Sequence, residues 1–204
     1  MTLRAELEAM LNGLTPKQTT RIIRSFSYFS HLANIAEDGE RLSRLVSRLM
    51  ELAKADMTRG PSGEGAALEP VLARLGDGVA SDNFVLRSEV GTGLERLAMD
   101  EGALETVLAT LVENARQAGA GEVVLTARLE GASAVLTLCD NGPGVPQADR
   151  ERIFDPFFTS RRESGGTGLG LPIARALVEG SGGALELTES ASGACFVLTV
   201  PFAA

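Results

Sequence analysis

Three short stretches carry residue types whose spacing could do chemistry. The first is Leu111–Ala115, where Glu113 and Asn114 stand side by side inside a helical pattern. Asn is a poor helix former, but its amide oxygen on a partly buried helix face could complete the oxygen shell of a magnesium ion. Glu113 could polarise an attacking nucleophile. The alternative interpretation is a solvated Glu–Asn pair on the helix surface.

The second stretch is Asp140–Val145, which follows an expected strand. A carboxylate at the end of a strand can accept a hydrogen bond from the exocyclic amine of a base. Gly142 and Gly144 would leave room beside it for a flat ring. Taken alone, the stretch is also compatible with an ordinary Asp-Asn-Gly turn.

The third stretch is the glycine-rich Gly165–Leu171, which opens an expected helix. Glycines let the backbone approach a phosphate closely, and a helix N-terminus offers free N–H groups and a partial positive charge. No Lys-Ser or Lys-Thr pair follows, which excludes a P-loop. A long loop rather than a strand precedes it, which argues against a dinucleotide-binding fingerprint. A flexible loop is the alternative.

The elements that must position these stretches alternate between helices and strands. Expected helices cover residues 68–75, 102–118 and 169–179, and expected strands cover 84–89, 122–129 and 133–140, with a final hairpin over 184–202. Asp100 is the expected cap of the second helix. Strand runs mixed with helices predict an α+β fold, a two-layer α/β sandwich with the helices on one face of the sheet.

The N-terminal part of the chain predicts a separate helical unit. Residues 1–58 carry apolar residues at steps of three and four, with a slip in phase at Gly39, and predict a helical hairpin. Residues 59–66 form a linker rich in glycine, and 67–204 form the sandwich domain. Such a long amphipathic segment needs a partner helix. The pattern favours a homodimeric helical bundle over a simple hairpin within one chain.

Composition excludes several classes of protein. The net charge of −8 argues against a nucleic-acid partner, no apolar run is long enough for a membrane segment, and the N-terminus is no signal peptide. Cys139 and Cys195 lack zinc-ligand spacing and a nearby cysteine partner. They predict two buried thiols on strands, and hence a cytoplasmic, reduced setting.

In this order, and with Ile153–Phe158 between the second and third, the three stretches resemble the catalytic ATP-binding domain of bacterial sensor histidine kinases. That domain has the Bergerat fold. The resemblance covers about residues 40–202, and Glu40–Asp56 resembles the end of a dimerisation helix. It implies transfer of the ATP γ-phosphate to a histidine, for relay to an aspartate of a response regulator.

The resemblance also implies a role for each matching residue. Asn114 would bind Mg²⁺ and Glu113 would assist phosphoryl transfer, whereas Asp140 would bind adenine. Phe157 and its neighbouring phenylalanines would pin the ATP lid, although core packing is an equal alternative for Phe154. The implied nucleotide-binding residues are Asn114, Asp140, Gly142, Gly144, Phe154, Phe158, Arg161, Arg162, Gly166, Thr167, Gly168, Leu169 and Gly170.

The chain departs from the family pattern at three places. Thr110 stands where a second Asn is common, Gln117 stands where a basic residue is common, with Arg116 beside it, and Ala194 stands where Thr is common near the last strand. These departures concern the fine phosphate contacts rather than the ATP site itself.

A phosphoacceptor is the part of the pattern that is missing. The only histidine is His31, and it lacks the acidic residue, Arg and Pro that follow such an acceptor in the family. It also lies only nine residues before Glu40, too close to precede a whole hairpin turn. The sequence favours a packed or partly exposed helix histidine, which makes self-phosphorylation doubtful. The alternatives are a non-catalytic, nucleotide-binding dimeric interaction module and an anti-sigma-type protein kinase.

Residues 13–38 resemble a different protein. Gly13–Pro16 and Arg21–Asp38 are similar to a helical segment of bacterial phosphoenolpyruvate carboxylase. None of that enzyme's catalytic residues can be placed in this chain, so no carboxylase activity is implied. Because the phase slip at Gly39 lies where the two resemblances meet, the sequence suggests a chimera, natural or engineered.

Overall fold

The computed structural model describes residues 65–79, 83–94, 96–161 and 166–202. The chain divides into two compact units, Met1–Val46 and Ser47–Ala204, and every described residue belongs to the second. The expected N-terminal hairpin lies outside the described residues, and so do His31 and Arg162.

The described part contains three helices and seven strands. The helices are α3 (Leu68–Val79), α4 (Glu101–Gln117) and α5 (Gly170–Gly180). The strands are β1 (Ala66–Ala67), β2 (Val85–Val90), β3 (Arg96–Leu97), β4 (Glu122–Glu130), β5 (Ser133–Asp140), β6 (Ala184–Thr188) and β7 (Cys195–Pro201). Each long element lies close to its predicted range, except that α3 continues four residues beyond the predicted end.

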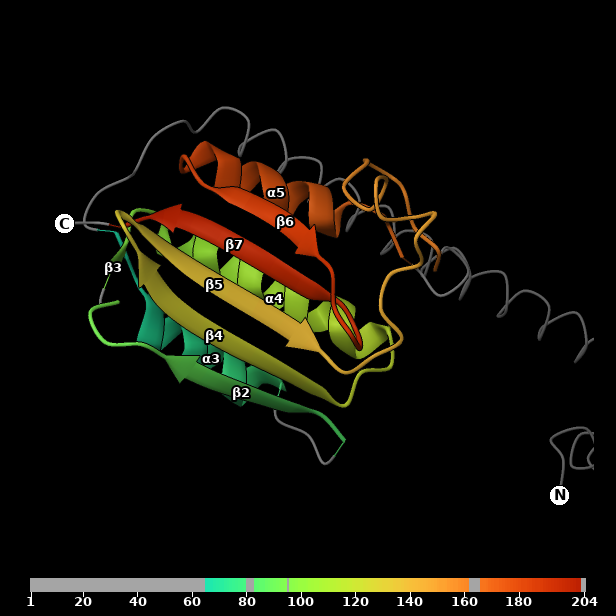
Figure 1. Ribbon diagram of the computed structural model, residues 1–204, viewed down its shortest axis with the longest axis horizontal. Helices are drawn as coiled ribbons and strands as arrows, with labels where there is room; N and C mark the ends of the chain where they lie inside the picture. Colours follow the sequence, from blue (N-terminus) through green and yellow to red (C-terminus); the bar gives the residue numbers. More distant parts are fainter. Residues whose placement is uncertain (1–64, 80–82, 95, 162–165, 203–204) are drawn as a thin grey trace, which may run out of the picture. The chain divides into compact units, whose positions relative to one another are not determined.

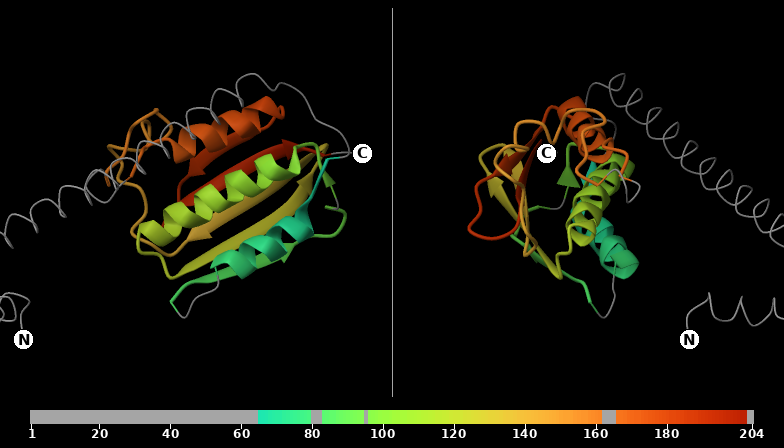
Figure 2. Two further views of the ribbon diagram at one scale, coloured as in Figure 1. Left: turned by 180° about the vertical axis from the view of Figure 1, so that it is seen from behind. Right: turned by 90° about the vertical axis from the view of Figure 1, so that its right-hand side faces the viewer.

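Five strands form one sheet in the order β2-β4-β5-β7-β6. Strand β2 runs parallel to β4, and the other neighbours are antiparallel. All three helices cover the same face of this sheet, as Figure 1 and the rear and edge views of Figure 2 show. The α+β fold and the two-layer sandwich predicted from the sequence are therefore confirmed.

The core lies between the sheet and the helices. In β5 the buried side chains of Ala134, Leu136 and Leu138 belong to it. Cys139, the next residue after Leu138, faces the opposite side because side chains alternate along a strand. The buried stripe of α4 comprises Leu104, Val107, Leu108, Leu111, Val112 and Ala115. This stripe fixes which face of α4 is left for solvent and ligands.

Helix α4 begins at the predicted cap. The Oδ1 atom of Asp100 accepts a hydrogen bond of 3.0 Å from the backbone N–H of Ala103, which satisfies one of the free donors of the first turn. The helix ends at Gln117 with Ala118 as its C-cap, and Gly119 follows with a φ of 89°. The C-terminal end of α4, with the polar residues Glu113 to Gln117, therefore lies only a short loop away from the start of β4 at Glu122.

A small second sheet pairs β1 with β3. The sequence analysis missed both strands, because two residues are too few to show the alternation on which strand prediction depends. No helix in the described ranges is long and apolar enough to cross a membrane.

The prediction of two buried thiols is wrong. Cys139 and Cys195 stand opposite each other on β5 and β7 and form a disulfide. They lie 56 residues apart in the sequence, and only the pairing of β5 with β7 brings them together. Sequence spacing cannot reveal a pairing that the order of the sheet creates.

Candidate functional site

The three predicted stretches meet at one end of the sandwich. The end of α4, the end of β5 and the start of α5 all lie at the right-hand side of Figure 1. The Oδ1 atom of Asn141 accepts hydrogen bonds from the N–H groups of Gly121 (2.9 Å) and Glu122 (3.0 Å). These bonds attach the loop after β5 to the loop after α4, so the two parts of the candidate site have fixed relative positions.

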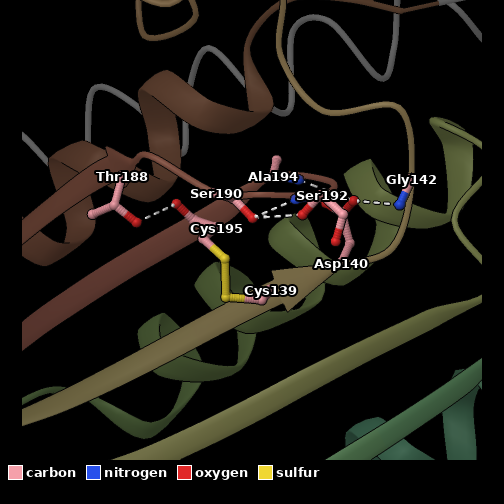
Figure 3. The surroundings of a disulfide bond; sticks show 8 residues. All are labelled: Cys139, Asp140, Gly142, Thr188, Ser190, Ser192, Ala194 and Cys195. Atoms are coloured by element: carbon pink, nitrogen blue, oxygen red, sulfur yellow. Dashed lines mark hydrogen bonds between the residues drawn. A yellow bond between two sulfur atoms is a disulfide. The ribbon is translucent and has the colours of Figure 1, made fainter.

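Asp140 is held by backbone donors from two directions. Its Oδ1 atom accepts from the N–H of Gly142 at 2.8 Å and from the N–H of Ala194 at 3.2 Å (Figure 3). Within the described residues both bonds end on Oδ1, which leaves Oδ2 to accept from a ligand. The carboxylate is therefore oriented before any ligand arrives.

Gly193 makes this arrangement possible. Its φ is 67°, and a Cβ atom there would overlap the carbonyl oxygen of Asp140. Gly193 belongs to the turn between β6 and β7, which we call the β6–β7 hairpin turn (residues 189–194). Gly144, one of the predicted site residues, lies against this turn, since its own Cβ would come within 2.8 Å of the Gly193 oxygen. Close backbone contact between the hairpin and the end of β5 thus requires glycine at position 193.

Glu113 forms a network on the exposed side of α4. Arg116 donates to both carboxylate oxygens at 2.7 Å, and the Nε2 group of Gln117 donates to Oε1 at 2.7 Å. The spacing of three and four residues places these side chains on one helix face. The hydrogen bonds from Arg116 are the largest cause that lowers the pKa of Glu113, with further contributions from Gln117 and from the charges of Arg116 and Arg161. Glu113 is therefore ionised at neutral pH.

Asn114 follows Glu113 and is partly exposed. Its carbonyl oxygen accepts from the N–H of Ala118 at 2.9 Å, so its backbone belongs to the last turn of α4. Arg161, on the loop before α5, lies close enough to Glu113 to stabilise the negative charge of that carboxylate. This links the predicted lid to the helix that carries Asn114.

The phenylalanines of the lid divide between packing and exposure. The ring of Phe154 lies edge-on to that of Phe196 at 6.5 Å, and Arg175 lies over its face at 5.0 Å. The guanidinium of Arg152 lies over Phe158 at 4.5 Å. Phe154 and Phe158 pack against the core, whereas Phe157 is 50% exposed and has a φ of 66°, which is unusual for a bulky residue.

The glycine loop folds back onto these phenylalanines. The N–H of Phe157 donates to the carbonyl of Gly168 at 2.9 Å. Gly168 has a φ of 68°, and a Cβ there would come within 2.5 Å of the Phe157 carbonyl carbon. The N–H of Gly166 donates to the Arg161 carbonyl at 3.0 Å. This part of the loop therefore has no room for side chains at either glycine.

The glycine loop leads directly into α5, which begins at Gly170. The hydroxyl of Thr167 accepts from the N–H of Leu169 at 3.3 Å, and Leu169 caps the helix without a side-chain hydrogen bond. In the first turn of α5 the N–H groups of Gly170 and Leu171 are consequently left for a ligand, whereas Pro172 has no N–H to offer. An anion is the ligand that such a helix end favours.

Sequence reasoning missed Gly193 as a site residue and saw Arg116 and Gln117 only as departures. Gly193 contacts Asp140 through sheet pairing, for which no local signal exists. By contrast, the network around Glu113 could have been predicted, because a Glu followed at three and four residues by Arg and Gln is a local helical pattern.

The chain is similar to known proteins in sequence and in structure. A model of the family described as histidine kinase-, DNA gyrase B-, and HSP90-like ATPases matches residues 99–204. The chain belongs to this ATPase family. A model of phosphoenolpyruvate carboxylase also matches, over residues 1–127. The similarity to this enzyme therefore covers much more than the predicted residues 13–38, and it does not end at Gly39.

Individual relatives agree with the family. The chain is 31% identical to the two-component sensor PprA of Pseudomonas aeruginosa, over 98% of this chain and 25% of PprA. The structure of full-length ShkA in complex with AMPPNP matches with a TM-score of 0.72 at 25% identity, over 93% of this chain and 46% of ShkA. The catalytic domain of the histidine kinase ThkA matches with a TM-score of 0.58 at 26% identity, over 66% and 92%.

The chain thus spans a quarter of the length of PprA. The alignments with PprA and ShkA extend into the N-terminal segment of this chain, and they give no support to a foreign join at Gly39.

Proposed function

We propose that this chain is the ATP-binding catalytic module of a two-component sensor histidine kinase. It would transfer the γ-phosphate of ATP to a histidine for relay to a response-regulator aspartate. The observation that supports this most is that the end of α4, the end of β5 and the start of α5 meet at one end of the sandwich, in a chain that belongs to this ATPase family.

Asp140 is the proposed adenine-binding residue. Because Gly142 and Ala194 orient its carboxylate through Oδ1, Oδ2 can accept a hydrogen bond from the exocyclic amine of adenine. A Cβ at Gly142 would come within 3.0 Å of the Asp140 carboxylate, and one at Gly144 within 2.8 Å of the Gly193 oxygen, so these glycines let the adjacent loop pack closely around Asp140. A guanine would present a carbonyl oxygen to the same carboxylate, so adenine is favoured.

The phosphates are proposed to lie at the start of α5. This helix has N–H groups without a side-chain cap, and Thr167 and Leu169 shape the turn that leads into it. Arg161 supplies a positive charge from the lid. The lid residue Arg162 lies outside the described residues and is proposed for the same role.

Asn114 is the proposed magnesium ligand. No group of three or more His, Cys, Asp or Glu that could hold a metal occurs in the parts of the chain that the structure describes. That fits Mg²⁺, which is commonly held by one or two protein ligands together with substrate phosphates and water. When bound, the ion would neutralise charge on the phosphates.

Glu113 is proposed to assist transfer by accepting a hydrogen bond from the attacking nucleophile. Its lowered pKa keeps the carboxylate ionised, which an acceptor needs. Arg116 and Gln117 hold the Glu113 carboxylate in place by hydrogen bonds. In the proposed role, the attacking nucleophile donates a further hydrogen bond to the same carboxylate.

The partners and the domain division are also proposals. The response regulator is the expected partner of a module of this kind. Residues 1–58 would form dimerising helices, 59–66 a linker, and 67–204 the ATP-binding domain. Because a suitable acceptor is missing, the phosphorylated histidine is proposed to lie outside this chain rather than at His31.

Binding and transfer are tested separately on the whole chain. Calorimetry with AMPPNP and Mg²⁺ should show binding, and Asn114→Ala should weaken it in the presence of Mg²⁺ but much less in its absence. Asp140→Ala should weaken binding of AMPPNP by at least about tenfold, the loss of one charge-assisted hydrogen bond. If neither variant changes the affinity, the proposed site is wrong.

Incubation with γ-labelled ATP then tests the acceptor. We expect nucleotide binding without acid-labile label on the wild-type chain, as for a catalytic module without its acceptor. Label that disappears in His31→Ala would show instead that His31 is the acceptor. Binding with no transfer to any added kinase acceptor domain would favour a non-catalytic interaction module.

A further inference from the structure

We propose that Cys139 and Cys195 form a reversible thiol–disulfide site that controls the affinity of the nucleotide site. The effect on nucleotide rests on the proposed function, whereas the redox site itself does not. The supporting observations are the position of the pair in the sheet, its connection to Asp140 and its accessibility.

The two cysteines oppose each other at the end of the β5–β7 pairing. The N–H of Asp140 donates to the Ala194 carbonyl at 2.9 Å, so Cys139 and Cys195 are a non-hydrogen-bonded antiparallel pair, the class in which side chains approach most closely. Their Cα atoms lie 4.1 Å apart. The backbone therefore holds both sulfur atoms together whether or not they are bonded, which favours a bond that forms and breaks without refolding.

Each cysteine is the direct chain neighbour of a residue that makes the nucleotide site. Asp140 follows Cys139, and Ala194, whose N–H donates to the Asp140 carboxylate, precedes Cys195 (Figure 3). Gly193, next along, packs on the Asp140 carbonyl. The disulfide thus ties together the two strand ends between which the carboxylate is oriented.

The turn between β6 and β7, which leads into Cys195, is held by its own hydrogen bonds. The hydroxyl of Thr188 donates to the Cys195 carbonyl at 3.2 Å, and the hydroxyl of Ser190 donates to the Ser192 carbonyl (Figure 3). The hairpin can therefore move as one piece. Its contact with Asp140 depends on the end of the β5–β7 pairing, where the disulfide lies.

The pair is open to a reductant from the face of the sheet opposite α3, α4 and α5. Strand alternation puts Cys139 on the face opposite the core residues Leu136 and Leu138. Cys139 is partly exposed, whereas Cys195 is 8% exposed. Cys139 is consequently the sulfur that an external thiolate reaches first.

The reaction is an exchange with a dithiol reductant, such as a thioredoxin-like protein. A reductant thiolate attacks the Cys139 sulfur, breaks the bond between the two protein sulfurs and releases Cys195 as a thiolate, which takes up a proton. The second thiol of the reductant then attacks the mixed disulfide, and Cys139 leaves and is protonated. Two electrons and two protons pass to the protein, and the reductant becomes a disulfide.

Reduction removes the covalent link next to Asp140. Without the bond, the contact between Asp140 and Ala194 is held by their two hydrogen bonds alone, so it opens more often, and a nucleotide must order the carboxylate when it binds. A ligand that orders its site binds more weakly than one that finds the site ordered. We expect the dissociation constant for AMPPNP with Mg²⁺ to rise at least about fivefold, the lower end of usual coupling between sites.

The test uses the whole chain, oxidised by glutathione disulfide or reduced by dithiothreitol, with mass spectrometry reporting the bond. AMPPNP affinity is measured in both states, and amide exchange at Ala194 is measured without nucleotide. The variant with both Cys139→Ala and Cys195→Ala is the control and should bind like the reduced chain in both conditions.

Weaker AMPPNP binding and faster Ala194 exchange on reduction, both lost in the double variant, would support the proposal. Equal affinity in the two states, unchanged exchange, or failure of the bond to form under glutathione disulfide would overturn it. If exchange responds but AMPPNP binds in neither state, the proposed function fails and the redox site stands without its link to nucleotide.

Discussion

At the scale of single residues, the candidate site depends on two carboxylate side chains, each of which is controlled by its neighbours. Glu113 is ionised because Arg116 lies beside it, and Asp140 is oriented because two backbone N–H groups donate to one of its oxygens. Each acts through a neighbour, so a change at the neighbour should alter the site while the proposed ligand-binding residue is intact.

Arg116→Ala should raise the pKa of Glu113, because the guanidinium that favours the charged form is lost. The folded-state pKa is lowered, so the stabilisation from this pair is present above the unfolded pKa and is lost as the pH falls through the folded value. Both side chains are about half exposed, which keeps that stabilisation small. Carboxyl-detected NMR titration of Glu113 measures the shift. Arg74→Ala, which removes a pair with Glu101 and Glu105 elsewhere, should leave the titration unchanged. An identical midpoint in wild type and Arg116→Ala would refute the assignment.

Gly193→Ala should weaken both folding and nucleotide binding, because the new Cβ would overlap the Asp140 carbonyl oxygen. Gly131→Ala is a matched control: its φ of 60° is similar, but nothing lies within 4 Å of the added Cβ. The control should cost about 1–2 kcal/mol from backbone strain alone. Thermal unfolding and AMPPNP calorimetry compare the two variants. Equal losses would show that contact with Asp140 is unimportant.

At the scale of elements, α4 has two functions. Its apolar stripe packs on the sheet, and its C-terminal turns carry Glu113 opposite that stripe and Asn114 at its edge, three residues after the buried Leu111. Because the helix positions both residues, its starting point matters for the site even though Asp100 lies about four turns away.

Asp100→Ala should lower the free energy of unfolding by about 0.5–2 kcal/mol, the usual effect of removing an N-cap side chain. The Ala103 N–H would lose its partner. Asp100→Ser should recover most of the loss, because serine still offers an oxygen to that donor. Urea unfolding followed by circular dichroism measures the difference. Equal stability of the alanine and serine variants would exclude the cap as the cause.

At the scale of the whole molecule, the sandwich is held together by the single core between the sheet and the three helices. Leu108 of α4 and Leu136 of β5 are fully buried members of it. The site at the end of the sandwich depends on this core, since it aligns the end of α4 with the end of β5.

Leu108→Ala should therefore destabilise the sandwich by about 2–5 kcal/mol, the cost of a core cavity. AMPPNP binding should fall only as far as the folded fraction falls, because no ligand-binding residue is changed. Val85→Ala, at a side chain that is 47% exposed, should cost less than about 1 kcal/mol. Urea unfolding provides the comparison. A similar cost for both variants would contradict the position of the core.

The sequence by itself determined what local interactions control. The cap at Asp100, the run of α4, the antiparallel strands β4 and β5, and the start of the last helix after Leu169 follow from capping, periodicity and turn residues, all of which act within a few positions. The family-like order of the three stretches likewise needs no tertiary information. The two-layer arrangement was predictable from the alternation of elements.

Only the tertiary structure decided which distant residues meet. The order β2-β4-β5-β7-β6 places Cys139 opposite Cys195 and Gly193 against Asp140, and neither contact leaves a mark in local spacing. The strands β1 and β3 were missed for the same reason, since each is stabilised by its partner rather than by its own pattern. Strand pairing depends on contacts between segments far apart in the chain, and local patterns in the sequence do not specify which strands become neighbours.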